Sequence, residues 1–243
     1  MDESLSGITS GLGHTSADRA DALYRERVQA RRVKADRMFA ILMVAQWAFA
    51  VVLALLVSPY AWAGKTRDFH PHLLAAIFMG GGIAVFPVLL AVFRPGWVVT
   101  RHVLVASQML WSALFIHLTG GRIETHFHVF GSLAFVAFYF DWPVLATATG
   151  VVVADHLIRG MLYPESVYGI PNPEWWRFLE HAGWVVFEDV VLVWFSITGL
   201  KEIKAMAVRQ AQVEALKESG DAKSAALEMV LKEIQPSLAG GAR

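Results

Sequence analysis

MFAILMVAQWAFAVVLALLV, the stretch Met38–Val57, carries no charged side chain over about twenty residues. As an α-helix rising about 1.5 Å per residue, it would span about 30 Å, the thickness of the hydrocarbon core of a bilayer. The apolar segment of a secretory signal peptide is shorter, about 7–15 residues. We therefore expect Met38–Val57 to cross a membrane as a helix rather than to be cleaved.

Further apolar stretches follow this one. They are Leu73–Phe93, Val103–Leu118, Phe127–Phe140, Val144–Ile158 and Ala182–Leu200. Phe127–Phe140 is short, so we expect its helix to extend back towards Glu124. None of the stretches alternates with period two, as the strands of a membrane barrel do. The sequence therefore predicts an all-α polytopic membrane protein, a bundle of about six transmembrane helices with a C-terminal cytoplasmic helix.

The composition agrees with a protein that lives in a lipid bilayer. Charged residues make up 17% of the 243-residue chain, against about a quarter in a soluble domain. Twenty-one basic residues offset 21 acidic ones, so no overall charge favours a nucleic acid partner. The chain contains no cysteine, which excludes disulfides, thiolate metal sites and cysteine nucleophiles.

The charged residues gather near the ends and divide the chain into three parts. Residues 1–37 form a cytoplasmic tail and basic helix, residues 38–200 the six-helix transmembrane domain, and residues 201–243 a cytoplasmic, coiled-coil-like tail. Basic side chains are concentrated between Arg25 and Arg37. Because such residues favour the cytoplasmic side of a membrane, we expect both termini in the cytoplasm.

The C-terminal tail shows a short coiled-coil pattern. Ser219-Gly220-Asp221 is expected to interrupt its helix. Beyond that break, leucine and isoleucine recur at spacings of four, three and four, at Leu227, Leu231, Ile234 and Leu238. A stretch this short needs a partner helix to be stable. We expect a cytoplasmic signalling partner or a homodimer through the 201–238 helix.

Histidines and acidic residues collect near the outer ends of the predicted spans. His117 ends the third span; Glu124, His126 and His128 open the fourth; Asp155, His156 and Arg159 close the fifth; and Glu180, His181, Glu188 and Asp189 begin the sixth. Ionisable groups at this depth are costly unless they are paired or hydrated, so they indicate a functional site.

The spacing of these residues suggests how they combine. Glu124 and His128 lie four residues apart, about one helical turn, and so do Asp155 and Arg159. Glu188 follows His181 by seven residues, which places a carboxylate about 10 Å deeper on the same helix face.

One histidine from each of three spans could converge on a single centre: His126 or His128, with His156 and His181. Imidazoles with an acid nearby suit zinc and would tolerate copper or iron. Two facing histidines could instead hold a haem. The alternative is an interhelical hydrogen-bond network that only fixes the bundle.

Three separated segments resemble a known bacterial membrane module. They are GGRIETHFHVFGSLAF at residues 120–135, DHLIRG at 155–160 and EHAGWVVFED at 180–189. Together they are similar to the N-terminal membrane-sensor module of some two-component histidine kinases and chemoreceptor-like proteins, over about residues 38–200. The resemblance implies a sensing role in a bacterial inner membrane but names no ligand.

The end of the chain resembles the phosphoacceptor helix of a histidine kinase only faintly. In that alignment Lys232 stands where the phosphoacceptor histidine would be, and an amine cannot replace imidazole in that chemistry. This part of the resemblance therefore argues against kinase activity in the chain.

We conclude from the sequence that the chain is a membrane-embedded sensory or signal-input protein with an outward-facing histidine and acid site. Two other functions remain open. One is a metal-dependent intramembrane hydrolase in which Glu188 or Asp155 acts as general base on a metal-bound water. The other is a haem-bearing redox protein.

Overall fold

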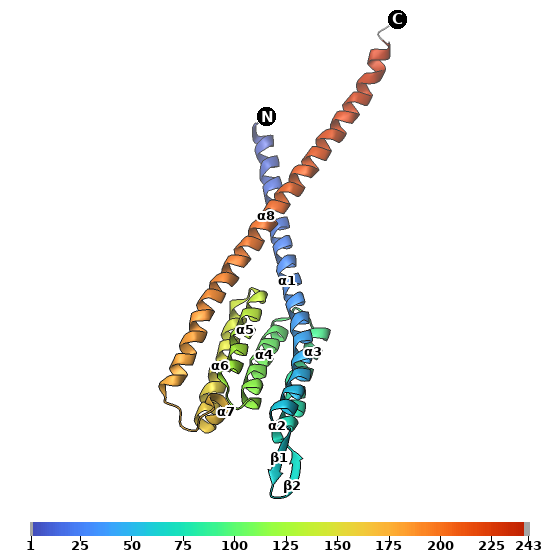
Figure 1. Ribbon diagram of the computed structural model, residues 1–243. Helices are drawn as coiled ribbons and strands as arrows, with labels where there is room; N and C mark the ends of the chain where they lie inside the picture. Colours follow the sequence, from blue (N-terminus) through green and yellow to red (C-terminus); the bar gives the residue numbers. More distant parts are fainter. Residues whose placement is uncertain (1, 241–243) are drawn as a thin grey trace. The chain divides into compact units, whose positions relative to one another are not determined.

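The protein is helical apart from one β-hairpin in the part of the chain that the structure describes. A computed structural model describes the backbone of residues 2–240 and the side chains of residues 16–61 and 64–232. In order, the elements are α1 Asp2–Val57, β1 Tyr60–Ala63, β2 Thr66–Phe69, α2 Pro71–Leu74, the π-helix η1 Ala75–Met79, α3 Gly80–Phe93, α4 Val98–Leu118, α5 Ile123–Val136, the 3₁₀-helix η2 Ala137–Tyr139, α6 Trp142–Leu162, α7 Glu165–Tyr168 and α8 Trp176–Gly240 (Figure 1).

The chain divides into two compact units. The bundle unit spans Gln29–Leu200. The terminal unit combines the residues up to Val28 with those from Lys201 onwards, so α1 and α8 each contribute to both units. The three-part division expected from the sequence stays a prediction.

Five of the described helical segments are long and apolar enough to cross a membrane. They are Ser16–Val57, Pro71–Phe93, Val98–Leu118, Trp142–Leu162 and Trp176–Lys232. The fourth expected span, Phe127–Phe140, corresponds to α5, which has only 14 residues and covers about 21 Å at 1.5 Å per residue. The chain is thus a helical membrane protein, and the count of six is not settled by helix length.

α5 nevertheless runs back along α4. Ser112 on α4 bonds His128 on α5 at 2.8 Å, and Gln108, one turn earlier on α4, donates to Ser132, one turn later on α5, at 2.9 Å. The two helices are therefore antiparallel. We call the end of the bundle unit that holds His117 the histidine end, and the end that holds Arg101 the arginine end.

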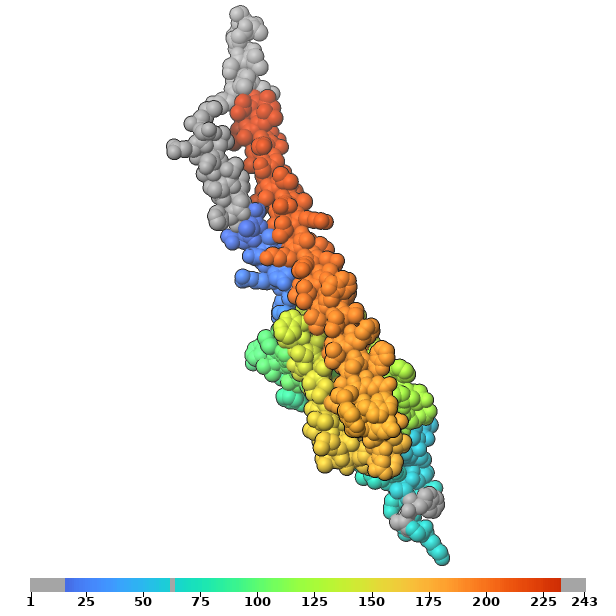
Figure 2. All heavy atoms as spheres, turned by 90° about the vertical axis from the view of Figure 1, so that its left-hand side faces the viewer, coloured from blue at the N-terminus to red at the C-terminus, as the bar shows by residue number. Residues whose placement is uncertain are grey.

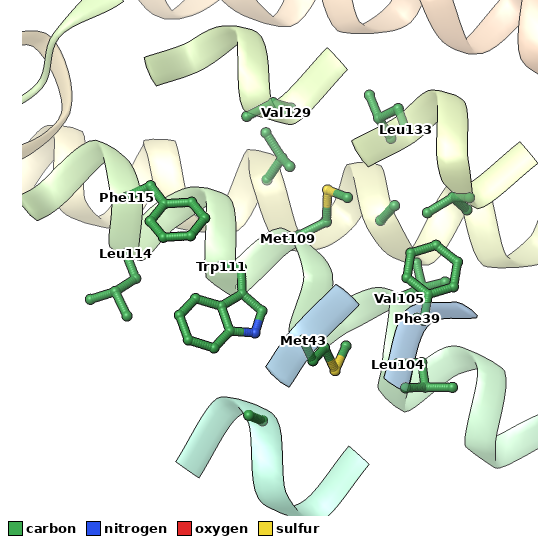
Figure 3. Close-up of a cluster of buried hydrophobic side chains, with 14 of the residues drawn as sticks. Phe39, Met43, Leu104, Val105, Met109, Trp111, Leu114, Phe115, Val129 and Leu133 are labelled. Atoms are coloured by element: carbon green, nitrogen blue, oxygen red, sulfur yellow. The ribbon is translucent and has the colours of Figure 1, made fainter. Parts of the chain in front are cut away.

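The middle of the bundle unit is an apolar core in which α1, α4 and α5 meet (Figure 3). Phe39 and Met43 of α1 and Trp111 of α4 are fully buried in it. Trp47, on the same helix as Phe39, packs its indole ring over Gly80 and Gly81, where an added Cβ would lie 3.0 Å from the ring. Gly80 and Gly81 therefore allow α1 and α3 to approach each other closely.

Buried polar groups bond to one another at the arginine end. The carboxylate of Asp36 is fully buried and accepts from the Tyr139 hydroxyl and the Gly96 amide, both at 2.6 Å. Arg101 forms an ion pair with Asp141 at 2.7 Å. Because Tyr139 ends η2, the segment from Ile123 to Tyr139 passes from the histidine end to the arginine end.

The apolar side chains on the outside of the bundle unit are typical of a surface in contact with lipid. Figure 2 faces this surface of α8, drawn in orange. Among the side chains of α8, Trp184, Phe187, Val190 and Trp194 are each at least 60% exposed.

In the terminal unit, α1 and α8 pack on each other. Ala20 and Leu23 lie against Ala207 and Ala211, and Arg19 pairs with Glu214 at 2.7 Å. The expected interruption at Ser219-Gly220-Asp221 is wrong, because α8 continues through it. One glycine in a helix costs only about 1 kcal/mol.

The predicted coiled-coil side chains in α8 are exposed where the structure describes them. Leu227 is 61% and Leu231 is 56% exposed. Ile234 and Leu238 lie outside the described side chains.

The turn between α4 and α5 allows a matched test of the fold. Gly120 and Gly121 both have positive φ, +68° and +75°, but an added Cβ meets nothing at Gly120 and lies 2.3 Å from the Gly169 nitrogen at Gly121. We expect Gly120→Ala to lower the free energy of unfolding by about 1 kcal/mol and Gly121→Ala by on the order of 3 kcal/mol. Thermal unfolding in detergent measures both, and equal melting temperatures would contradict the close approach of the two turns.

Candidate functional site

Three histidines from three helices meet at the histidine end. We call His126 of α5, His156 of α6 and His181 of α8 the histidine triad. Their ring centroids lie 5.5 Å apart for His126 and His156, 5.4 Å for His126 and His181, and 6.3 Å for His156 and His181. The structure thus brings together one imidazole from each of the three spans that the sequence singled out.

Each ring of the triad is oriented by its own helix. The Nδ1–H groups of His126, His156 and His181 donate to the carbonyls four residues earlier, at 3.0, 3.1 and 2.8 Å. A carbonyl only accepts, so Nδ1 carries the hydrogen and the lone pair of the neutral ring is on Nε2. Metal-binding histidines are commonly held in this way, with the other ring nitrogen bonded to a backbone carbonyl.

The triad borders a small cavity. Its volume is about 30 Å³, enough for one water or one ion, and apolar side chains, among them Phe130, Val152 and Val185, complete its wall. His126 is 5% exposed, and its Nε2 is buried without a hydrogen-bond partner. A buried ring nitrogen without a partner beside such a cavity makes the triad a candidate binding site.

The spacing of the rings is close to that of a metal site. Three imidazoles bound to one tetrahedral zinc at about 2.0–2.1 Å have ring centroids about 5 Å apart. Two of the three pairs are near this value, and the third, at 6.3 Å, is about 1 Å wider. As they stand, no group of three described His, Asp or Glu side chains is arranged as a metal site, so His156 and His181 would have to approach each other.

A wider groove borders the triad. It has a volume of about 560 Å³, and its walls include His126, His181, Trp176, Glu180 and Trp184. Because two triad histidines line both the groove and the small cavity, the groove gives a path by which an ion could enter.

Tyr168 of α7 supports the triad from the loop. Its ring stands edge-on to His181, 5.7 Å between centroids, and contacts α6 at Gly160, where an added Cβ would lie 3.1 Å away. Burial raises the pKa of the Tyr168 hydroxyl, so the ring stays uncharged beside the histidine.

Asp155 and Arg159 form a tight ion pair beside the triad. Arg159 Nε and Nη2 each donate to one Asp155 oxygen at 2.6 Å, and Asp155 Oδ2 lies 3.3 Å from His156 Nδ1. Arg159 Nη1 reaches Ser166 of α7 at 2.8 Å, and the Ser166 oxygen lies 2.9 Å from His117 Nδ1. Both oxygens of the Asp155 carboxylate are therefore bound by Arg159. His117 bonds Ser166 of α7 and is not part of the triad.

His128 lies on another face of α5, away from the triad. Its ring bonds Ser112 at 2.8 Å and Gln46 of α1 at 3.0 Å. The pairing of His128 with Glu124 that their spacing suggested is wrong, because Glu124 is exposed and its carboxylate lies 3.6 Å from Arg122. A carboxylate near the water can remain hydrated and needs no imidazole partner.

Glu188 and Asp189 lie further along α8 and do not line the triad cavity. Asp189 accepts from Thr149 of α6, while Glu188 Oε2 and Asp189 Oδ1 are buried without a hydrogen-bond partner. The role of Glu188 as the deeper carboxylate of the site stays a prediction.

Sequence reasoning missed two groups of polar residues. Gln46 was visible as a lone amide in the apolar stretch Met38–Val57 and bonds His128. Ser166 and Tyr168 lie in a short loop helix without periodicity, so no pattern in the sequence pointed to them.

The chain is similar to one curated transducer. It is 29% identical over 163 residues to Transducer protein Htr8 of Halobacterium salinarum, a match that covers 64% of this chain and 25% of that protein. The chain therefore corresponds to about a quarter of the relative's length. No family model and no solved structure matches. The similarity and the apolar helices fit a membrane sensory protein.

The different surroundings of His126 and His128 give a matched pair of variants. We expect His126→Ala to weaken Zn²⁺ binding at the triad by about 100-fold or more, because it removes a ligand. His128→Ala should leave that affinity unchanged and lower the free energy of unfolding by about 1–3 kcal/mol, because Gln46 and Ser112 lose a buried partner. Calorimetric titration and thermal unfolding of the purified protein measure both effects. Equal loss of Zn²⁺ affinity in the two variants would show that the triad is not the site.

Proposed function

We propose that this chain is a signal-input protein of a bacterial inner membrane and that the histidine triad is its stimulus site. The observation that carries the proposal is the similarity to a transducer over 163 residues. The bundle unit contains the triad, its cavity and the wider groove.

In this proposal the chain crosses the membrane six times, with both termini in the cytoplasm. The fourth span is Ile123–Tyr139, formed by α5 and η2 together. Support comes from its two ends: His126 belongs to the histidine end, and Tyr139 bonds Asp36 at the arginine end. The basic cluster Arg25–Arg37 then lies on the cytoplasmic side, and the triad near the outer surface.

The ligand that suits the triad is a single transition-metal ion. Neutral imidazoles with Nε2 lone pairs suit zinc and would also bind copper or iron. The triad cavity, at about 30 Å³, holds an ion but not the macrocycle of a haem. A hydrolase needs a free base next to the metal-bound water. Asp155 is engaged by Arg159, and Glu188 does not line the cavity, so these residues favour a sensor over an enzyme.

Ion binding would change the distance between helices α6 and α8. The triad joins α5, α6 and α8, and drawing His156 and His181 to ligand spacing closes about 1 Å between α6 and α8. A ligand shifts a conformational equilibrium only if it binds one state more tightly, and the closer spacing of the rings supplies that difference. The output is carried by the cytoplasmic helix 201–238, to a signalling partner or to a second copy of the chain.

Amide hydrogen exchange tests this proposal in the full chain. We expect saturating Zn²⁺, added to the protein in lipid nanodiscs, to change exchange in residues 201–232 by about twofold or more, because the binding-competent state becomes dominant. His181→Ala should abolish the change. His102→Ala serves as control, since His102 bonds Thr147 and belongs to no part of the triad.

Two results would contradict the proposal in different ways. If Zn²⁺ binds and the exchange of residues 201–232 does not move, the site is structural and not sensory. If the wild-type chain binds no Zn²⁺, Cu²⁺ or Fe²⁺ at all, the triad is a packing contact between helices and not a metal site.

A further inference from the structure

A second group of histidines lies at the histidine end, apart from the triad. His72, near the start of the second membrane segment, stands 5.0 Å from His117 of α4 between ring centroids, and His70 stands 4.2 Å from His72. His72 and His117 are far apart in the sequence, and the fold brings their rings together.

The rings of His72 and His117 face a cavity of their own. It has a volume of about 280 Å³ and is bordered by Tyr163, Glu165 and Ser166 as well as the two histidines. None of the triad residues lines it. The cavity is therefore a separate place where a ligand could bind.

His72 has a ring nitrogen that the protein does not satisfy. Its Nδ1 is buried and has no hydrogen-bond partner. The neighbouring His70 does not supply one, because its Nδ1 accepts from the backbone amide of His72 at 3.1 Å. A buried, unpartnered nitrogen destabilises the folded protein, and a ligand in the cavity would remove that cost.

His117 is held in place by a chain of polar contacts. Its Nδ1 lies 2.9 Å from the Ser166 oxygen, which also accepts from Arg159 Nη1 at 2.8 Å. The serine oxygen has two lone pairs and can accept from both, which leaves the Nε2 lone pair of His117 free to bind. Outer partners of this kind orient metal-binding histidines.

We propose that His72 and His117, with the Glu165 carboxylate, form a second site for a divalent first-row transition cation. Two imidazoles that share one tetrahedral ion lie about 5 Å apart between ring centroids, and this pair lies at 5.0 Å. Glu165 is exposed and would swing inwards to complete the site, since no described group of three such side chains is at ligand spacing as it stands.

The charges around the cavity favour a cation over an anion. The carboxylate of Glu165 on its wall repels anions, and the nearest guanidinium, that of Arg159, is paired with Asp155 at 2.6 Å. Imidazole with one carboxylate is a donor set that Zn²⁺, Cu²⁺ and Ni²⁺ all accept.

Ion counting on the full chain tests this proposal independently of the sensory function. The untagged protein in nanodiscs is titrated with Zn²⁺ by calorimetry, and bound metal is counted after desalting. We expect two ions per chain for wild type and for His102→Ala, and one for His72→Ala and for His117→Ala. The triad variant His126→Ala/His156→Ala should also keep one ion, and this ion should be lost when His72→Ala is added.

Glu165→Gln keeps the test decisive if a histidine variant folds poorly, because Glu165 is exposed. We expect it to weaken the second Zn²⁺ about tenfold and to leave the triad ion unchanged. The proposal is overturned if wild type binds a single ion that only the triad variant removes, or if His72→Ala and His117→Ala both keep two. An anion such as phosphate that binds in place of Zn²⁺ and depends on His117 would also overturn it.

Discussion

The structure of the bundle unit depends on one constraint: a polar group inside a bilayer must find its partner within the protein. The chain meets this constraint with polar contacts at several depths of the bundle. Asp36 and Tyr139 bond each other at the arginine end, while Gln46, Ser112 and His128 do so between the helices. Between and around them lies an apolar core centred on Trp111. Among the described side-chain atoms without a hydrogen-bond partner, His126 Nε2 belongs to the lining of the triad cavity and His72 Nδ1 to that of the second cavity, and both proposed sites begin from that observation.

The rings of the triad are held by hydrogen bonds to the backbone of their own helices and not by bonds to one another. Each imidazole uses Nδ1 to bond the carbonyl one turn earlier on its own helix, so the three helices can move without breaking these bonds. What changes with such motion is the distance between the Nε2 atoms. An ion that binds three Nε2 atoms at a fixed separation would therefore favour one spacing of α5, α6 and α8 over others. This property suits an input site better than a rigid catalytic centre does.

Part of this arrangement could be predicted from the sequence. Long uncharged stretches predicted helices across a membrane, and histidines at corresponding depths predicted that three of them could meet. The sequence favoured His126 over His128 but could not decide between them, because each residue turns a helix by about 100° and the helix start was unknown. The start at Ile123 places His126 towards His156 and His128 towards Gln46. The contributions of Ser166 and Tyr168 could not be foreseen, since a four-residue loop helix has no periodic pattern to read.

X-ray absorption at the zinc edge tests the central claim most directly. The variant His72→Ala/His117→Ala removes the proposed second site, and one equivalent of Zn²⁺ is then added to the protein in nanodiscs. The account predicts three imidazole nitrogens at about 2.0–2.1 Å around the ion, and two when His181→Ala is also present. Scattering from one imidazole or none, unchanged by His181→Ala, would show that the three rings do not share an ion.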